Sequence, residues 1–338
     1  MENRHIKKLF LPKFKAQKLY ICVLKFAFLK TIYNTSNFIS DSETYVTIGT
    51  FDGVHFGHQK IIEKLVFEAK KAQKKSLVLT FFPHPRMVLQ KDTSVKLLNT
   101  IDERAKMLEK TGLDYLIIHP FSVEFSRMTA LEFVKDVLVK QLNISKLIIG
   151  YDHHFGKNRE GNINQLSKYS HVYNFKVEEI PAQDIDEVSV SSTKIRRALL
   201  SGDLQTANHY LGYPFMLNGT VINGKKVGGK IGFPTANIAI EEPYKLIPKT
   251  GVYIVKSNID NKIVFGMMNI GNRPTVNGNY QTIEVHFFNF NDDLYGKKLT
   301  VELLYFLRDE QKFDSISLLV NQLKTDAENT KNYLNNKL

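Results

Sequence analysis

The sequence predicts two domains of α/β and β class: a Rossmann-like domain with a parallel sheet, then a small antiparallel β-barrel that ends in a helix. Three observations predict this fold. The chain has 338 residues, more than one domain usually holds. Strand-like apolar runs alternate with helical periodicity from residue 44, and the pattern becomes strand-rich near residue 213. We therefore expect a basic extension over residues 1–30, a first domain over 31–212 and a second over 213–338.

The first domain is predicted to contain a parallel sheet because its strands and helices alternate. The predicted strands are TYVTIG, SLVLTF, DYLIIH, KLIIG and HVYNFKVEEI, most of them too uniformly apolar to have a face in water. The helix after the first strand carries Ile61, Ile62, Leu65, Val66, Ala69 and Ala72 at the spacing of one buried face. Two later helices open with capping boxes, Thr100 with Glu103 and Thr129 with Glu132.

The second domain is predicted to be a barrel of antiparallel strands. It follows two helices that we expect to stop at Gly202 and Gly212. Its predicted strands are FMLNGTVIN, GVYIVKSN, IVFGMMNIG, TIEVHFFNF and KKLTVELLYFL. A final helix, about 313 to 335, is expected to pack on the barrel through Ile316, Leu319, Leu323 and Ala327.

The composition narrows the class of protein. The only cysteine is Cys22, which excludes a disulfide scaffold or a thiolate metal cluster. The net charge is +12, but residues 1–30 hold eight basic residues against one Glu, so we expect no nucleic-acid partner. The apolar run in that segment is too short to span a membrane, which needs ~20 residues, and Lys25 interrupts it. We expect a cytoplasmic protein without a membrane span, either a monomer or a transient oligomer.

The stretch GTFDGVHFGH, residues 49–58, lies between a predicted strand and a predicted helix. Gly53 and Gly57 would let the backbone approach a phosphate closely, and the helix start offers unpaired N–H groups. His55 and His58 can point the same way at the first turn. The turn taken alone is equally consistent with a purely structural role. Asp52 is expected to cap this turn through its own backbone, with a place near a metal as the alternative.

A second segment, SSTKIR at residues 191–196, strengthens the nucleotide interpretation. It places three hydroxyls at a helix start, followed by cations. Ser191 or Ser192 alone would be interpreted as an ordinary N-cap. Together, the two helix starts predict the two halves of a triphosphate clamp.

These motifs carry a resemblance. The HxGH turn with SSTKIR resembles the nucleotidyltransferase superfamily. More narrowly, GTFDGVHFGHQKII, TFFPHP, GYDHHFGKNREGN and VSSTKIR together resemble the prokaryotic bifunctional riboflavin kinase/FAD synthetase, over about residues 44 to 330. The resemblance implies that the first domain is of nucleotidyltransferase type and joins FMN and ATP to give FAD and pyrophosphate.

The same resemblance implies roles for individual residues of the first domain. It assigns His55 and His58 to adenylyl transfer, and it assigns to ATP binding Gly49, Phe51, Gly57, Ser191, Ser192, Thr193 and Arg196. Asp152 and Phe155 fall at the flavin-binding positions. His153 and His154 lie where other residue types are expected, so they are either solvated loop residues or substrate contacts. His84 in the PHP segment either caps the sheet edge or contacts substrate.

In the second domain, the segments GGKIGFPTANI (228–238), IEVHFFNF (283–290) and NIGNRPTVNG (269–278) resemble the riboflavin kinase module of the same family. That module moves the γ-phosphate of ATP to the 5′-hydroxyl of riboflavin. Strand alternation sends Glu284 to the face opposite Ile283 and Val285. The resemblance implies that Glu284 is the base, that Gly232, Thr235 and Asn237 bind ATP, and that the oxygen ligands of Thr235 and Asn237 bind Mg²⁺. Arg308 is assigned to flavin, with barrel stabilisation as the alternative.

One departure from the family pattern concerns the phosphate-binding segment of the kinase module. Where the family often has Gly-Arg, this chain has Gly228, Gly229 and Lys230. Lys230 could replace the Arg as a point charge without the bidentate fork. Two rival functions are a nucleotidyltransferase for another phosphorylated metabolite, which would lack the barrel, and a nucleic-acid-binding protein, suggested by the charge.

Overall fold

The computed structural model describes residues 29–91, 94–151, 154–157, 160–181, 190–224, 227–275 and 278–337. The predicted basic extension lies outside the described residues except for Leu29 and Lys30. Within the described part of the chain, no helix is both long and apolar enough to cross a membrane.

The N-terminal domain is built on a six-stranded sheet whose neighbouring strands are all parallel, as the sequence predicts. In spatial order the strands are β1 (Lys30–Tyr33), β4 (Tyr115–Pro120), β3 (Lys75–Phe82), β2 (Thr44–Ile48), β5 (Ile144–Gly150) and β6 (Lys176–Ile180). The edge strand β1 was not predicted. It has only 4 residues, too few to show a period, and its pairing with β4 places it in the sheet.

Helices cover both faces of this sheet. On β3, Val78 packs into one apolar cluster with Leu65 of α1, while Leu77 packs into another with Val137 of η2. The helices of this domain are η1 (Thr35–Asn37), α1 (Phe56–Lys71), α2 (Pro85–Leu89), α3 (Ile101–Glu109), α4 (Val123–Ser126), α5 (Ala130–Glu132), η2 (Phe133–Gln141) and α6 (Ile163–Tyr173). Both predicted capping boxes are present, at Thr100 and Thr129.

One predicted strand began too early. Residues 171–173, expected to be strand, form the end of α6. Ile163, Leu166, Tyr169 and Tyr173 recur at helical spacing and pack on one apolar cluster, so this packing overrides the strand preference of the aromatic residues. Asn174, in the left-handed region with φ 55°, stops the helix before β6 begins.

The C-terminal domain is a closed barrel of six antiparallel strands, in the order β10-β11-β8-β7-β12-β9. The strands are β7 (Met216–Ile222), β8 (Ala236–Ala239), β9 (Gly251–Ile259), β10 (Lys262–Thr275), β11 (Gly278–Phe287) and β12 (Lys298–Arg308), and the short helix α10 (Val227–Lys230) precedes β8. Residues 236–239 were not among the predicted strands. They form β8 because their pairing with β7 and β11 closes the barrel.

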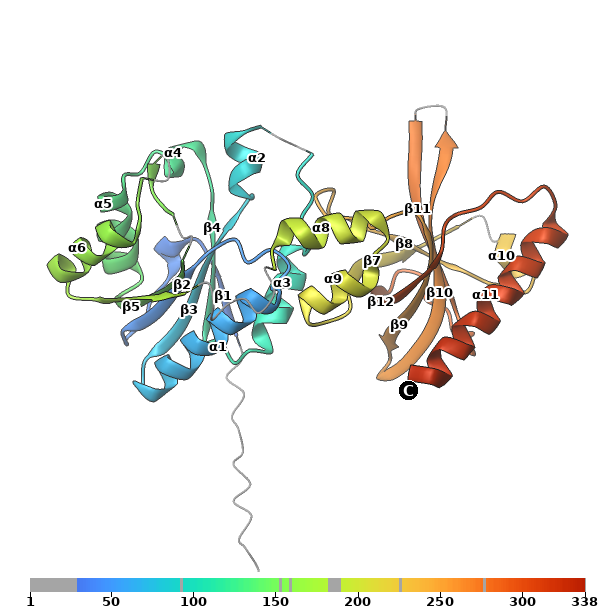
Figure 1. The fold of residues 1–338 in the computed structure, drawn as a ribbon, viewed down its shortest axis with the longest axis horizontal. Helices are drawn as coiled ribbons and strands as arrows, with labels where there is room; N and C mark the ends of the chain where they lie inside the picture. The colour runs from blue at the N-terminus through green and yellow to red at the C-terminus, as the bar shows by residue number, and fades with distance from the viewer. Residues whose placement is uncertain are drawn as a thin grey trace, which may run out of the picture.

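Two helices lie between the domains, as Figure 1 shows: α8 (Ser192–Ser201) and α9 (Leu204–Leu211). Both stop at the predicted glycines, with φ of 88° at Gly202 and 77° at Gly212. Their buried residues Ile195, Leu199 and Leu211 belong to the same apolar cluster as the barrel interior. The helices therefore share a core with the barrel, while a division at residue 213 stays a prediction.

The last helix, α11 (Ile316–Lys337), runs along the outside of the barrel (Figure 1). Its presence was predicted, but the assignment of Ile316 to the packed face is wrong, because that side chain is 67% exposed. The fully buried positions of the helix are Asp326 and Thr330. Arg308 of β12 pairs with Asp326, so polar contacts as well as apolar periodicity decide which face meets the barrel.

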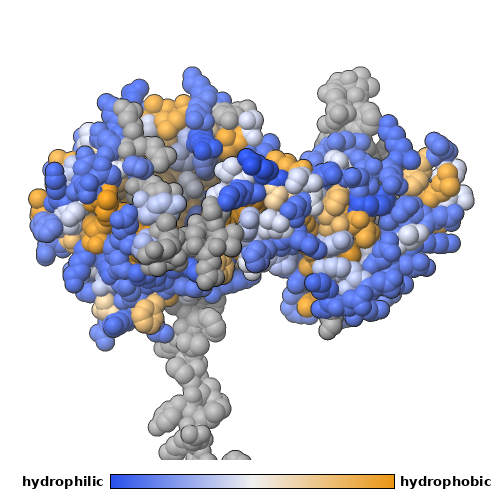
Figure 2. All heavy atoms as spheres, in the orientation of Figure 1, coloured by the Kyte–Doolittle hydropathy of each residue, from blue (hydrophilic) through white to orange (hydrophobic). Residues whose placement is uncertain are grey.

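A buried ion pair joins the two domains. Lys245 Nζ lies 2.5 Å from Glu103 Oε2, and both side chains are fully buried. Lys245 Nζ also donates to the Leu98 carbonyl at 2.6 Å, and the backbone N–H of Asn218 donates to Glu103 Oε1 at 3.2 Å. Figure 2 shows the two domains as two lobes with a mostly hydrophilic surface and small, separate hydrophobic patches. The interface is thus held by desolvated polar contacts as well as by the shared apolar core.

Candidate active sites

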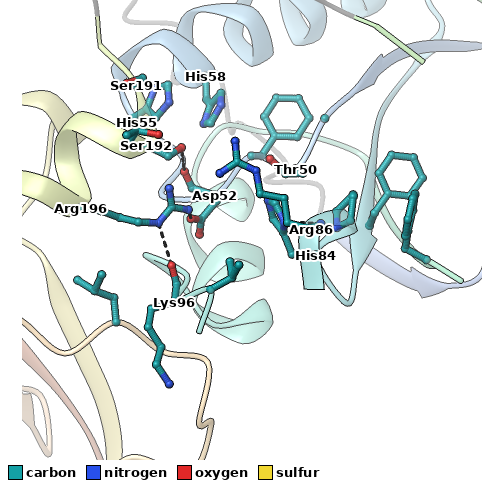
Figure 3. Close-up of a pocket in the computed structure, with 18 of the residues that line it drawn as sticks. Thr50, Asp52, His55, His58, His84, Arg86, Lys96, Ser191, Ser192 and Arg196 are labelled. Atoms are coloured by element: carbon teal, nitrogen blue, oxygen red, sulfur yellow. Dashed lines mark hydrogen bonds and ion pairs between the residues drawn. The ribbon is translucent and has the colours of Figure 1, made fainter. Parts of the chain in front are cut away.

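A cavity of about 1520 Å³ opens where the N-terminal sheet meets α8 and the barrel. Its walls come from the turn at residues 49–58, from the start of α2, from the start of α8 and from residues 238–247 of the second domain. The residues that the sequence predicts for adenylyl transfer all line it: Gly49, Phe51, His55, Gly57, His58, Ser191, Ser192, Thr193 and Arg196. The two segments are therefore brought together (Figure 3).

The histidine turn packs tightly. His55 is the N-cap residue of α1, His58 lies in its first turn, and the two rings stack with centroids 3.6 Å apart. Burial, with smaller effects from His55 and Arg104, holds the pKa of His58 well below its usual 6.5. His58 is therefore a neutral imidazole near pH 7, a form that can give one N–H to a phosphate oxygen. Gly53 has φ +88°, and a Cβ there would lie 2.6 Å from Leu98 Cδ1, so this position requires glycine.

The second half of the predicted clamp is set by the start of α8. Ser191 is its N-cap and accepts the Lys194 N–H at 3.3 Å, so the N-cap interpretation is also correct for this residue. Ser192 Oγ donates to the Asp52 carbonyl at 2.9 Å. Arg196 Nε donates to the Lys96 carbonyl at 2.8 Å, and its guanidinium pairs with the Asp52 carboxylate.

The expectation that Asp52 caps its own turn is wrong. Its side chain is 1% exposed, and its carboxylate accepts the backbone N–H groups of Leu98 and Asn99 at 2.9 and 3.2 Å. These donors lie on a distant segment that passes beside the turn, and a contact between segments so far apart in sequence leaves no local pattern.

Other predicted residues of this site fall at its edge or outside the described chain. Asp152 and His153 lie outside the described residues. His154 lines the cavity, as does Phe155, whose buried ring packs 5.7 Å from that of Phe133. The flavin role of Phe155 stays a prediction.

Residues near α2 complete the wall of this cavity. His84 caps α2 by accepting the Arg86 N–H at 3.2 Å, and burial lowers its pKa to about 4. His84 therefore caps a helix and not the sheet edge. The alternative role of His84, a contact with substrate, stays a prediction. Arg86 and Lys96 also line the cavity and were not predicted. For Arg86, the sequence carried one signal of a place in this cavity, namely its position directly after the PHP segment.

The second candidate site lies on the barrel. Ile283, Val285 and Phe287 are buried while Glu284 is half-buried, which confirms the predicted alternation. Thr235 Oγ1 lies 3.4 Å from Glu284 Oε2, and Asn237 is the register partner of Glu284 on the next strand. The structure therefore gathers these three predicted residues. Ile283, on the other face of β11, lines the first cavity, whereas Thr235, Asn237 and Glu284 do not line it.

The glycines before this site differ in their surroundings. A Cβ at Gly228 would lie 2.2 Å from the Phe233 carbonyl oxygen, so the turn requires glycine there. Gly229 has open space around it, and Lys230 is exposed. Gly232 adopts φ +83°, which glycine accommodates without strain. No steric limit at residue 229 therefore explains why this chain has Gly where the family often has Arg.

Arg308 makes a bidentate ion pair with Asp326 of α11, at 2.9 Å from Nε and 2.7 Å from Nη2. Its third contact is with the Asp309 carbonyl at 2.9 Å. Of the two roles considered, these contacts are those of barrel stabilisation. The flavin contact stays a prediction.

The fold has two domains, with one candidate site in the cavity where they meet and the other on the barrel. Residues 38–194 match the family model of FAD synthetase and residues 211–334 that of riboflavin kinase. The chain belongs to the family of bifunctional riboflavin kinase/FMN adenylyltransferases.

Similar proteins cover nearly the whole chain. The protein of that name from Buchnera aphidicola subsp. Schizaphis graminum is 39% identical over 311 residues, which is 91% of this chain and 98% of the relative. The one from Listeria monocytogenes is 37% identical over 309 residues, 90% of this chain and 98% of the relative. A crystal structure described as a macrolide-efflux protein from Streptococcus pneumoniae is 32% identical, covers 90% of this chain and 99% of its own, and has a TM-score of 0.81.

Proposed function

We propose that this chain makes FMN and then FAD, with ATP as co-substrate in both steps. Riboflavin and ATP give FMN and ADP on the barrel. FMN and ATP then give FAD and pyrophosphate in the cavity of the N-terminal domain. The observation that supports this most is that two separate groups of candidate residues occur, one on each of the two domains that match the two family models.

At the barrel site, the reaction needs a base because the 5′-hydroxyl of riboflavin is a weak nucleophile. We infer that Glu284 accepts its proton while the oxygen attacks the γ-phosphorus and ADP leaves. The nearby Thr235 and Asn237 offer a hydroxyl and a carboxamide oxygen, which fit Mg²⁺, an ion that normally keeps several waters and the nucleotide phosphates. When bound, Mg²⁺ would neutralise phosphate charge.

In the cavity, the reaction needs positive charge and N–H donors around the ATP phosphates. The start of α1, the two stacked histidines and the start of α8 with Arg196 supply them. The FMN phosphate would attack the α-phosphorus in line and release pyrophosphate. Gly49, Phe51, Ser191, Ser192 and Thr193 complete the proposed ATP site.

The remaining expectations belong to the same proposal. We infer a cytoplasmic enzyme that is a monomer or transient oligomer, with no nucleic-acid partner. The rival that adenylylates another metabolite is disfavoured because the barrel with its Thr–Glu pair is present.

Product analysis tests the proposal. Purified protein is incubated with Mg²⁺ and ATP, once with riboflavin and once with FMN, and the flavins are separated by chromatography. We expect FMN and FAD from riboflavin, and FAD from FMN. If neither product forms from either substrate, the proposal fails.

A further inference from the structure

We propose that Asp52 is a positioning residue for adenylyl transfer: it fixes the start of α8, and Arg196 in particular, relative to the histidine turn. This inference rests on the proposed function of the cavity. Asp52 is part of the turn at residues 49–58, yet its contacts reach the other half of the predicted clamp.

The two halves of the clamp meet at Asp52. The backbone carbonyl of Asp52 accepts the hydroxyl of Ser192, and its carboxylate pairs with the guanidinium of Arg196. Figure 3 shows Asp52 between the histidines and Arg196. Asp52 therefore links the histidine turn directly to the start of α8.

The Asp52 carboxylate is itself held by backbone N–H groups of a neighbouring segment. It is 1% exposed, and its Oδ1 accepts the N–H groups of Leu98 at 2.9 Å and Asn99 at 3.2 Å. Oδ2 lies 3.1 Å from the Leu98 nitrogen, and Arg104 Nη2 is 3.8 Å from Oδ1. Because both oxygens already have protein donors, the carboxylate has little capacity left for a metal ion, and the metal alternative for Asp52 is disfavoured.

Arg196 is the group that this arrangement orients. Its Nε donates to the Lys96 carbonyl at 2.8 Å while the Asp52 carboxylate holds Nη2, so two acceptors fix the plane of the guanidinium. The side chain is 22% exposed and lines the cavity, which leaves its other N–H groups available to an anion. The buried carboxylate faces two guanidinium groups, those of Arg104 and Arg196, so the cluster keeps an excess of positive charge beside the cavity.

A double-mutant cycle tests this role. Asp52→Asn keeps the size and one acceptor oxygen of the side chain but removes its charge, and Arg196→Gln removes the oriented cation. We expect Asp52→Asn to raise the KM for ATP and lower kcat/KM of FAD formation from FMN about tenfold or more. In the Arg196→Gln background the same Asp52→Asn change should cost less than about threefold, because the group that Asp52 orients is absent.

The riboflavin kinase rate of each variant serves as the control for folding, since its site lies on the barrel. If Asp52→Asn alone does not fold, the comparison of Arg196→Gln with the double variant, in which both charges are removed, still gives the cost of the Asp52→Asn change without the oriented cation, and a cost of about tenfold or more there would overturn the proposal. Equal losses in both backgrounds, or unchanged FAD formation by folded Asp52→Asn, would overturn the proposal.

The failure of the proposed function is a distinct result, because the wild type itself would then form no FAD. Calorimetric titration with ATP and Mg²⁺ needs no turnover and decides the Asp52 proposal in that case. We expect Asp52→Asn to weaken one class of ATP site and leave the other unchanged. If Asp52→Asn binds ATP at both sites as tightly as the wild type does, the positioning role is contradicted.

Discussion

Replacement of Lys245 by Met tests whether the buried ion pair holds the two domains together. Lys245 and Glu103 are both fully buried, and Lys245 Nζ also donates to the Leu98 carbonyl. The pKa of Lys245 is lowered overall, because the effect of burial exceeds the opposing effect of the Glu103 carboxylate. Met fills a similar volume but leaves Glu103 with the backbone donors of Thr100 and Asn218 and no cation.

The expected cost follows from this geometry. Removing one partner of a buried ion pair leaves an uncompensated buried charge, which costs about 3–5 kcal/mol. We expect the free energy of unfolding, measured by urea denaturation, to fall by about that amount. The double variant Glu103→Gln with Lys245→Met removes both charges, while the Gln amide oxygen can still accept a backbone N–H, and it should recover part of the loss.

A matched control is Lys298→Met, the same substitution at an exposed pair. The Lys298 side chain is 81% exposed and lies 3.9 Å from Glu241, so we expect a change of about 0.5 kcal/mol or less. If Lys245→Met changes stability no more than this control does, the inference that the pair locks the interface is refuted.

Four further predictions concern the two sites and the barrel. Glu284→Gln should lower FMN formation roughly 10²–10⁴-fold and spare conversion of FMN to FAD. His58→Ala should lower FAD formation roughly 10²-fold and spare FMN formation. Loss of both activities in one folded variant would contradict separate sites. Because the folded-state pKa of His84 is about 4 and its usual value is 6.5, the unfolded chain binds the proton first, and stability should fall as pH drops from 6.5 to about 4. His84→Asn, which can still cap α2, should show a flatter pH dependence in thermal unfolding, and an unchanged slope would exclude His84 as its cause. Arg308→Met should lower the free energy of unfolding, measured by urea denaturation, by about 3 kcal/mol, because Asp326 is 1% exposed and would lose its cation. A change under about 1 kcal/mol would exclude this ion pair as a main support of α11.

The sequence predicted most of the fold because local signals and tertiary packing agree over most of the chain. Both capping boxes and the glycine stops at Gly202 and Gly212 needed only local residues. The misses are elements whose state depends on distant partners. Strand β1 exists through its pairing with β4, and β8 through the closure of the barrel.

The candidate sites divide in the same way. The residue types around His55, His58 and Glu284 are recognisable from sequence because each lies in a short motif. The contacts of Asp52 with Leu98 and Arg196 join three distant segments, so no spacing in the sequence could predict them. Lys96 was missed because a single cation in a loop carries no pattern, and Arg86 because only its place after the PHP segment marks it.

The most direct test of the two-site account is the origin of the two phosphorus atoms in FAD. The protein is incubated with riboflavin, Mg²⁺ and ATP radiolabelled at either the γ- or the α-phosphate, and FMN and FAD are separated and counted. The account predicts γ-label in both FMN and FAD, and α-label in FAD alone. Label from the α-phosphate in FMN, or FAD that carries neither label, would contradict it.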